Sequence, residues 1–220
     1  MLANDLETAR FNMIAQQIRP WDVFDPRVLH AFETVPRERF VSDEYLGLAF
    51  ADIAVPIGAG QTMMKPVQEA RMLQALDVQP GNSVLEIGTG SGFTTACLAQ
   101  LGGTVTSYEI NEALSTTAAQ RLDALGVRNI ELVVGNGLDA SLAPESFDVI
   151  AVTGSLPAYQ ASLEQLLKPG GRMFVVVGEE PAMSARLVSR TGQGDFWRET
   201  LFETVLAPLE NAPQVDHFKF

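Results

Sequence analysis

The sequence predicts an α/β fold built on a mostly parallel sheet, and two observations support this. From Ser83 onward, short apolar runs alternate with segments of helical periodicity. Unbroken apolar runs separated by helices indicate strands that are covered on both faces, as in parallel sheets. The length of 220 residues suits one structural domain. We expect a helical segment over residues 1–80 that packs on a core over residues 81–220.

The first eighty residues have the pattern of helices and loops. Hydrophobic residues recur at helical spacing over Leu6–Ile18, until Pro20 stops the pattern. The pair Asp25-Pro26 combines a helix N-cap residue with a proline at the first helical position, and it predicts a helix to Val35. A further helix is expected over Pro66–Leu76.

The second part of the chain alternates strands and helices. The expected strands are Val84–Ile87, Val105–Tyr108, Ile130–Val134, Val149–Val152 and Met173–Val177. The expected helices are Phe93–Leu101, Ala113–Leu125 and Tyr159–Leu167. The tail differs, because Gly192-Gln193-Gly194-Asp195 between Arg186–Thr191 and Phe196–Phe202 predicts a hairpin. The last residues, His217–Phe220, alternate polar and apolar side chains like an edge strand.

Composition and charge exclude several classes of function. The formal net charge of −12 argues against nucleic-acid binding, which depends on Lys and Arg at the phosphates. The acidic start, Met1–Glu7, does not fit a signal peptide, and no apolar run approaches the ~20 residues of a membrane span. We therefore expect a cytoplasmic protein with neither a membrane nor a nucleic-acid partner.

Cysteine and histidine are scarce in this chain. One cysteine, Cys97, excludes an intrachain disulfide. Together with His30 and His217 it leaves too few ligands for a zinc cluster, so no metal site is expected.

A glycine-rich turn follows the first predicted strand of the core. Val84–Ile87 runs into Gly88-Thr89-Gly90-Ser91-Gly92, and a helix comes next. Glycines there allow a tight turn and a close approach of a ligand to the backbone. About twenty positions later Glu109 ends the next strand, where a carboxylate is placed to accept hydrogen bonds from ribose hydroxyls. A nucleoside cofactor is expected.

Two residues around the loop select among nucleoside cofactors. The dinucleotide fingerprint requires glycine at the sixth position, where this chain has Phe93. A carboxylate at Glu86 would repel a pyrophosphate and favour a ligand with an ammonium and a sulfonium. S-adenosyl-L-methionine therefore fits, and NAD does not. After the third strand, Gly135-Asn136-Gly137 faces the same crevice and is expected to meet the adenine.

These residues, with several others, resemble the protein-L-isoaspartate O-methyltransferase family over nearly the whole chain. The matching segments are Gln17–Arg19, Asp25 with Val28-Leu29, Val35–Val41, Pro56–Thr62, Val84–Gly92, Phe147–Thr153 and Leu167–Arg172. Pro56–Thr62 looks like a pre-cofactor motif specific to this family, whereas most methyltransferases share the glycine loop.

The resemblance implies a Rossmann-like class I S-adenosylmethionine-dependent methyltransferase fold. Its mostly parallel seven-stranded sheet would end in an antiparallel hairpin and carry an N-terminal helical addition. The implied acceptor is a protein or peptide with isoaspartate, whose carboxylate is methylated to start repair. The implied cofactor-binding residues are Gln61, Thr62, Glu86, Gly88, Thr89, Gly90, Ser91, Gly92, Glu109, Ile110, Asn136, Gly137 and Thr153.

The chain departs from the family pattern at two positions. The family's run after Gln-Thr is Ile-Ser-Gln-Pro with an active-site serine, and Met64 stands at that serine position. Asn136 replaces an aspartate but keeps a carbonyl acceptor. A carboxylate acceptor is already ionised near pH 7, so catalysis should depend on orientation rather than on a base. Thr62 and Lys65 are the candidates for that orienting, catalytic role.

Two alternatives stay open at this point. A methyltransferase of the same fold could act on another small-molecule or protein acceptor, since Met63 and Met64 would suit an apolar substrate at the mouth of the site. A homologue could also bind the cofactor without catalysing methyl transfer.

Overall fold

One seven-stranded sheet forms the centre of the computed structural model, which describes residues 3–214. Its strands are β3 (Ser83–Ile87), β4 (Thr104–Glu109), β5 (Ile130–Val134), β6 (Phe147–Leu156), β7 (Leu167–Glu179), β8 (Ala182–Arg190) and β9 (Phe196–Glu203). The order across the sheet is β5-β4-β3-β6-β7-β8-β9. Strands β3 to β7 pair in parallel, while β8 and β9 pair antiparallel. The predicted fold class is confirmed, including the C-terminal hairpin.

The helices lie before and between the strands. The α-helices are α1 (Ala3–Asn12), α2 (Pro26–Thr34), α3 (Pro66–Leu76), α4 (Phe93–Gln100) and α5 (Glu112–Ala124). Shorter helical turns are η1 (Met13–Ile18), η2 (Arg19–Trp21), η3 (Arg37–Phe40), η4 (Asp43–Leu48) and η5 (Ala161–Leu166). Asp25 caps α2 as predicted, since its side chain accepts a hydrogen bond from the Arg27 backbone N–H. Within residues 3–214 no helix is long and apolar enough to cross a membrane.

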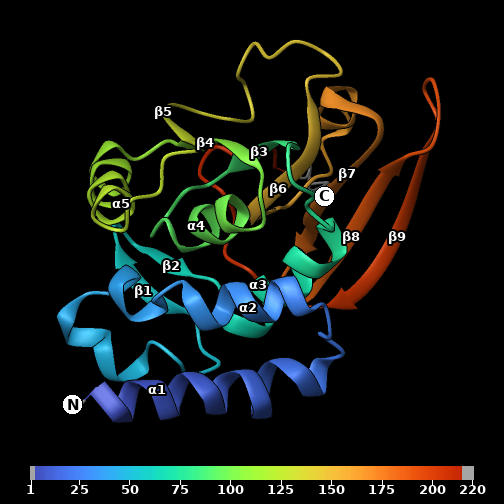
Figure 1. Cartoon of the computed structure of the whole chain (residues 1–220). Coiled ribbons are helices and arrows are strands. Elements are labelled where there is room, and N and C mark those ends of the chain that lie inside the picture. The colour runs from blue at the N-terminus through green and yellow to red at the C-terminus, as the bar shows by residue number, and fades with distance from the viewer. Residues whose placement is uncertain (1–2, 215–220) are drawn as a thin grey trace, which may run out of the picture.

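Two hydrophobic clusters form the core, one on each face of the sheet. Successive residues of a strand point to opposite faces, and accordingly Val84 belongs to one cluster and Leu85 to the other. The Val84 cluster also contains side chains of α2, α3 and α4, so the N-terminal helices and the sheet share one core. Figure 1 shows α1 and α2 along the bottom of the molecule and β8 and β9 at its right edge. The division of the chain at residue 80 stays a prediction.

A two-stranded hairpin interrupts the N-terminal helices. The strands β1 (Val55–Gly58) and β2 (Gln61–Met63) pair antiparallel. The expectation of only helices and loops before residue 80 is wrong here. The hairpin forms because Gly58, Ala59 and Gly60 all have positive φ values, of 100°, 52° and 73°, and so reverse the chain.

The helix expected over Tyr159–Leu167 is shorter than predicted and is a 3₁₀ helix rather than an α-helix. Strand β6 extends to Leu156 and β7 begins at Leu167, so only ten residues connect them, of which Ala161–Leu166 form a short 3₁₀ turn. The Gln160 side chain bonds instead to the Leu138 carbonyl oxygen at 3.0 Å. The edge-strand pattern at 217–220 lies outside the described residues.

Candidate active site

A cavity opens at the carboxyl ends of β3, β4, β5 and β6, the edge where ligands bind in open parallel sheets. Its volume is about 670 Å³ when the space in the open mouth is included. The lining residues that the sequence analysis had named are Gln61, Thr62, Gly88, Gly90, Glu109, Ile110, Asn136, Gly137 and Thr153.

The glycine loop forms one wall of the cavity. Gly88 has a φ of 102°, and a Cβ on it would collide with the Thr153 hydroxyl oxygen. That hydroxyl donates to the carbonyl oxygen of Ile87 at 2.9 Å and ties β6 to the end of β3. Glycine is therefore required at residue 88 by its backbone conformation and by the close approach of a neighbouring strand.

Three of the predicted cofactor-binding residues in the loop, Thr89, Ser91 and Gly92, are not among the residues that line the cavity. The hydroxyls of Thr89 and Ser107 lie 2.6 Å apart in the core, and Ser91 Oγ accepts from the Phe93 backbone N–H at 3.3 Å. Gly92 precedes α4 with a φ of 89°, in close contact with α5. Their direct contact with a cofactor stays a prediction.

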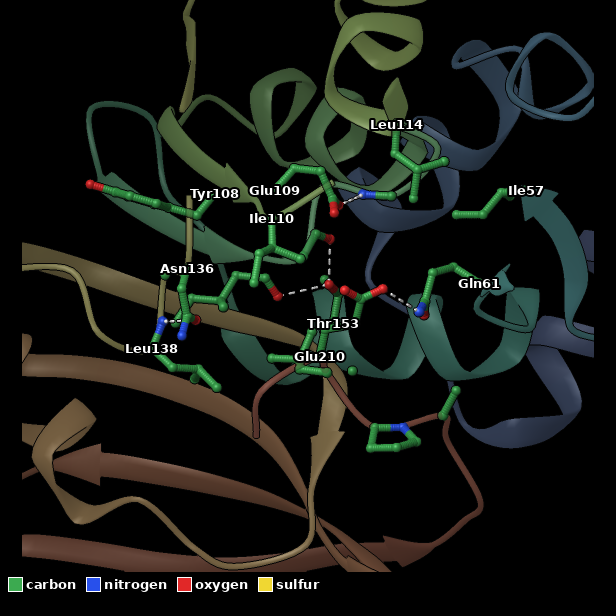
Figure 2. Close-up of a pocket in the computed structure, with 18 of the residues that line it drawn as sticks. Ile57, Gln61, Tyr108, Glu109, Ile110, Leu114, Asn136, Leu138, Thr153 and Glu210 are labelled. Atoms are coloured by element: carbon green, nitrogen blue, oxygen red, sulfur yellow. Dashed lines mark hydrogen bonds between the residues drawn. The ribbon is translucent and has the colours of Figure 1, made fainter. Parts of the chain in front are cut away.

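Glu109 lies directly beside this loop. Its Oε2 accepts from the Gly90 N–H at 2.8 Å, and its Oε1 accepts from the Asn111 N–H at 3.0 Å. Figure 2 shows the Glu109 carboxylate pointing into the cavity next to Leu114. Because each carboxylate oxygen has a second lone pair, both can still accept a hydroxyl from a ligand.

The opposite end of the cavity is lined by apolar side chains. Tyr108, Ile110 and Leu138 surround Asn136 there (Figure 2). The side-chain oxygen Oδ1 of Asn136 accepts from the Leu138 backbone N–H at 3.1 Å, and its side-chain Nδ2 donates to Asp139 Oδ2 at 2.5 Å. Asn136 therefore shapes the turn that closes this end, and the apolar surroundings suit a flat ring such as adenine.

Glu86 is fully buried behind the loop and does not line the cavity. Its Oε2 accepts from Thr95 at 2.5 Å and from Ser107 at 2.6 Å, whereas its Oε1 has no hydrogen-bond partner among the described residues. Burial raises the pKa of Glu86 to about 8, the two hydroxyls oppose the rise, and the charge of Glu109 adds to it. A positive charge in the cavity would favour the ionised form.

A C-terminal segment, Leu206–Glu210, crosses the mouth of the cavity, and we call it the strap. It lies against β6, since the Ser155 N–H donates to the Ala207 carbonyl oxygen at 2.9 Å and the Leu209 N–H donates to the Ser155 carbonyl oxygen at 3.0 Å. Gln61 Nε2 donates to Glu210 Oε1 at 3.1 Å across the mouth (Figure 2). The residues of the strap, together with Ile57 and Leu114, line the cavity but were not predicted from sequence.

Comparison with known proteins places this architecture in a family. A model of the protein-L-isoaspartate(D-aspartate) O-methyltransferase family matches residues 9–214. The chain belongs to this family. It is 38% identical over 200 residues to a protein-L-isoaspartate O-methyltransferase of Koribacter versatilis, covering 91% of this chain and 90% of that protein. The corresponding enzyme of Magnetococcus marinus is 39% identical over 204 residues, with 92% and 89% covered.

Solved structures agree with the family assignment. A protein-L-isoaspartate O-methyltransferase from Plasmodium falciparum, crystallised with S-adenosyl-L-homocysteine, matches with a TM-score of 0.79 and 19% identity. The match covers 93% of this chain and 97% of that one, and it supports the fold. Another protein-L-isoaspartate O-methyltransferase structure matches with a TM-score of 0.79 at 25% identity, over 94% of this chain and 66% of that one. The predicted family and its O-methyltransferase class are confirmed.

The segment that departs from the family's serine motif points partly away from the cavity. Met63 and Met64 are 3% and 5% exposed and belong to the hydrophobic core, so the expectation of two methionines at the mouth is wrong. The alternation of β2 turns Thr62 outward and Met63 inward, and Met64 is buried one residue beyond the end of the strand. Lys65 precedes α3 and is not among the lining residues.

Proposed function

We propose that this chain transfers the methyl group of S-adenosylmethionine to the carboxylate of isoaspartyl residues in proteins or peptides. The observation that carries the proposal is the Glu109 carboxylate beside Gly90 at the glycine loop. The lining residues include two carboxylates, Glu109 and Glu210, and no lysine or arginine. Such a cavity disfavours a pyrophosphate and favours a positively charged ligand.

The lining residues suit the separate parts of S-adenosylmethionine. Glu109 would accept from the ribose hydroxyls, the apolar end around Leu138 would hold the adenine, and Gln61 with Gly88 would lie beside the methionine part. S-adenosylmethionine supplies a methyl group on a positively charged sulfur. The predicted contacts of Glu86, Thr89, Ser91 and Gly92 with the cofactor are part of this proposal.

The chain has to orient the acceptor rather than remove a proton from it. A carboxylate is ionised near pH 7, so its oxygen can bond to the methyl carbon while the carbon–sulfur bond breaks and its electron pair stays on sulfur. In-line geometry then decides the rate. Thr62 is the residue best placed for this role, because it lines the cavity and its hydroxyl makes no hydrogen bond to any described residue. Lys65 stays a second candidate.

Incubation with an isoaspartyl peptide and cofactor labelled in its methyl group tests the proposal. The matched control is the same peptide with a normal aspartate. We expect label in the isoaspartyl peptide alone, in a linkage that alkali hydrolyses as a methyl ester. Background label together with calorimetric cofactor binding would overturn the proposal and leave a methyltransferase with another acceptor or a non-catalytic cofactor-binding homologue.

The proposal includes a cytoplasmic location and no nucleic-acid partner. The formal net charge of −12 supports the second point, because the chain would repel a phosphate backbone.

A further inference from the structure

The guanidinium of Arg37 is fully buried next to the active site. Arg37 is 0% exposed, and it lies in η3, within a part of the family-like N-terminal segment to which no role has been given so far. Its Nη2 donates to the Met64 carbonyl oxygen at 2.7 Å, and its Nε donates to the Ala49 carbonyl oxygen at 2.9 Å. Its Nη1 forms an ion pair with Glu69, a residue of α3 that is 1% exposed. A buried charge whose three nitrogens each donate to a different residue indicates a specific positioning task.

The same guanidinium also contacts the helix that follows the glycine loop. Its central carbon lies 4.6 Å from the centre of the Phe93 ring, and Phe93 is the first residue of α4. Phe32 and Phe40 pack edge-on against that ring, each with centroids 5.6 Å apart. Thr94 Oγ1 donates to Glu69 Oε1 at 3.4 Å, which adds a second connection between α4 and α3. Arg37 therefore joins the cofactor-side helix to the segment that ends at Lys65.

Other contacts also hold the segment Gln61–Lys65: the Met63 and Met64 side chains are buried in the core, and the Lys65 carbonyl oxygen accepts from the Glu69 N–H at 3.1 Å. β2 pairs with β1 on one side only, and the Lys65 N–H donates to Gln68 Oε1 at 3.1 Å. Between these two attachments, the Met64 carbonyl oxygen accepts its hydrogen bond from Arg37. Because Thr62 is two residues away, the place of its hydroxyl relative to the glycine loop depends on the same hydrogen bond.

We propose that Arg37 is a positioning residue for methyl transfer: it fixes the segment Gln61–Lys65, and with it Thr62, against the cofactor loop. This inference rests on the proposed function for its kinetic consequence. Its structural consequence, an ordered backbone over residues 61–65, does not depend on the identity of the acceptor.

The test compares Arg37→Lys with Arg190→Lys. Lysine keeps the charge but cannot reach three separate acceptors. Arg190 is a matched control, since it is 5% exposed and donates to the Leu167 carbonyl oxygen at 2.5 Å and to Glu145 at 2.6 Å, at the amino end of β7. Both variants should lower Tm. Only Arg37→Lys should raise the KM for an isoaspartyl peptide, by about tenfold or more, while the Kd for the cofactor changes less than threefold.

Hydrogen exchange of the backbone amides provides a second readout that needs no activity. We expect exchange over residues 61–65 to speed up at least tenfold in Arg37→Lys and to stay unchanged in Arg190→Lys. Unchanged exchange and unchanged KM in a folded Arg37→Lys would overturn the inference and leave Arg37 a purely structural residue. If the wild type methylates no isoaspartyl peptide, the proposed function fails, and the exchange comparison still decides the role of Arg37.

Should Arg37→Lys not fold, Glu69→Gln replaces it. This variant keeps the volume of the side chain and removes the negative charge that pairs with the guanidinium. We expect the same direction of change, with KM raised about threefold and faster exchange over residues 61–65. A loss of Tm alone would again overturn the inference.

Discussion

The side chains of Gln61 and Glu210 meet across the mouth of the cavity, with Gln61 Nε2 3.1 Å from Glu210 Oε1. Gln61 comes from the β1–β2 hairpin, and Glu210 ends the strap, 149 residues later in the chain. Both residues line the cavity, and their hydrogen bond connects the β1–β2 hairpin to the strap (Figure 2). We expect a bound cofactor to leave past this link.

Removing the link should therefore speed cofactor dissociation. We expect Gln61→Ala and Glu210→Ala each to raise the off-rate about two- to tenfold, because a hydrogen bond of this kind contributes about 0.5–1.5 kcal/mol. In a double-mutant cycle the double variant should be no faster than the faster single variant. Stopped-flow measurement of cofactor release checks this. Fully additive effects would show that the two side chains act separately.

Replacing Glu109 should weaken cofactor binding more than any change at the strap. Glu109→Ala removes the acceptor proposed for the ribose and also the partner of the Gly90 N–H. We expect a loss of about 1–3 kcal/mol in binding free energy, measured by calorimetry. Glu131→Ala, an exposed carboxylate on β5, is the control and should bind normally. Equal affinities for the two variants would mean that the ribose lies elsewhere.

The part of the site that was predictable from sequence is local in the chain. The glycine loop and Glu109 occupy the ends of two adjacent strands, and a spacing of about twenty residues suffices to predict that they meet. The strap was not predictable, because Leu206–Glu210 is held by backbone hydrogen bonds to Ser155, far away in sequence. Such contacts depend on tertiary packing and leave no periodic pattern.

Met64 shows the limit of reasoning by resemblance. Resemblance to the family's motif put this residue at the position of the active-site serine and left a place at the mouth open as one alternative, whereas packing places it in the core. The turn at Gly58–Gly60 sets which residues of β2 face the solvent and so accounts for the burial of Met63, whereas Met64 is buried beyond the end of that strand. The hairpin was not predicted, because the proline and glycines of Pro56–Gly60 are typical of a loop. The inward and outward faces of β2 could therefore not be assigned from sequence.

Thr62 should contribute to acceptor turnover through its hydroxyl. Thr62→Val keeps the shape of the side chain and removes the hydroxyl, whereas Thr62→Ser keeps the hydroxyl. We expect kcat/KM for an isoaspartyl peptide to fall about tenfold in the valine variant, equivalent to about 1.4 kcal/mol, and less than threefold in the serine variant. Cofactor affinity should stay unchanged in both. Equal activities of the two variants would argue against an orienting hydroxyl.

The cofactor-free protein should lose stability as pH rises from about 4.5 to 8. Burial raises the pKa of Glu86 to about 8, so in this range the folded state binds a proton that the unfolded state has released. The free energy of unfolding then falls with increasing pH. Each pKa unit corresponds to about 1.4 kcal/mol, so the total fall amounts to a few kcal/mol. Burial also raises the pKa of Glu69 to about 7, although Arg37 opposes this, and Glu69 acts in the same direction.

Glu86→Gln separates the contribution of Glu86 from the rest. The amide keeps the size of the side chain and does not titrate, so unfolding by urea at pH 5 and pH 8 should show a smaller difference than in the wild type. Glu131→Gln, which changes an exposed carboxylate, should keep the wild-type difference. A Glu86→Gln protein whose stability still falls by the wild-type amount would show that Glu86 is ionised in the folded state, and that its unpartnered oxygen is satisfied by solvent.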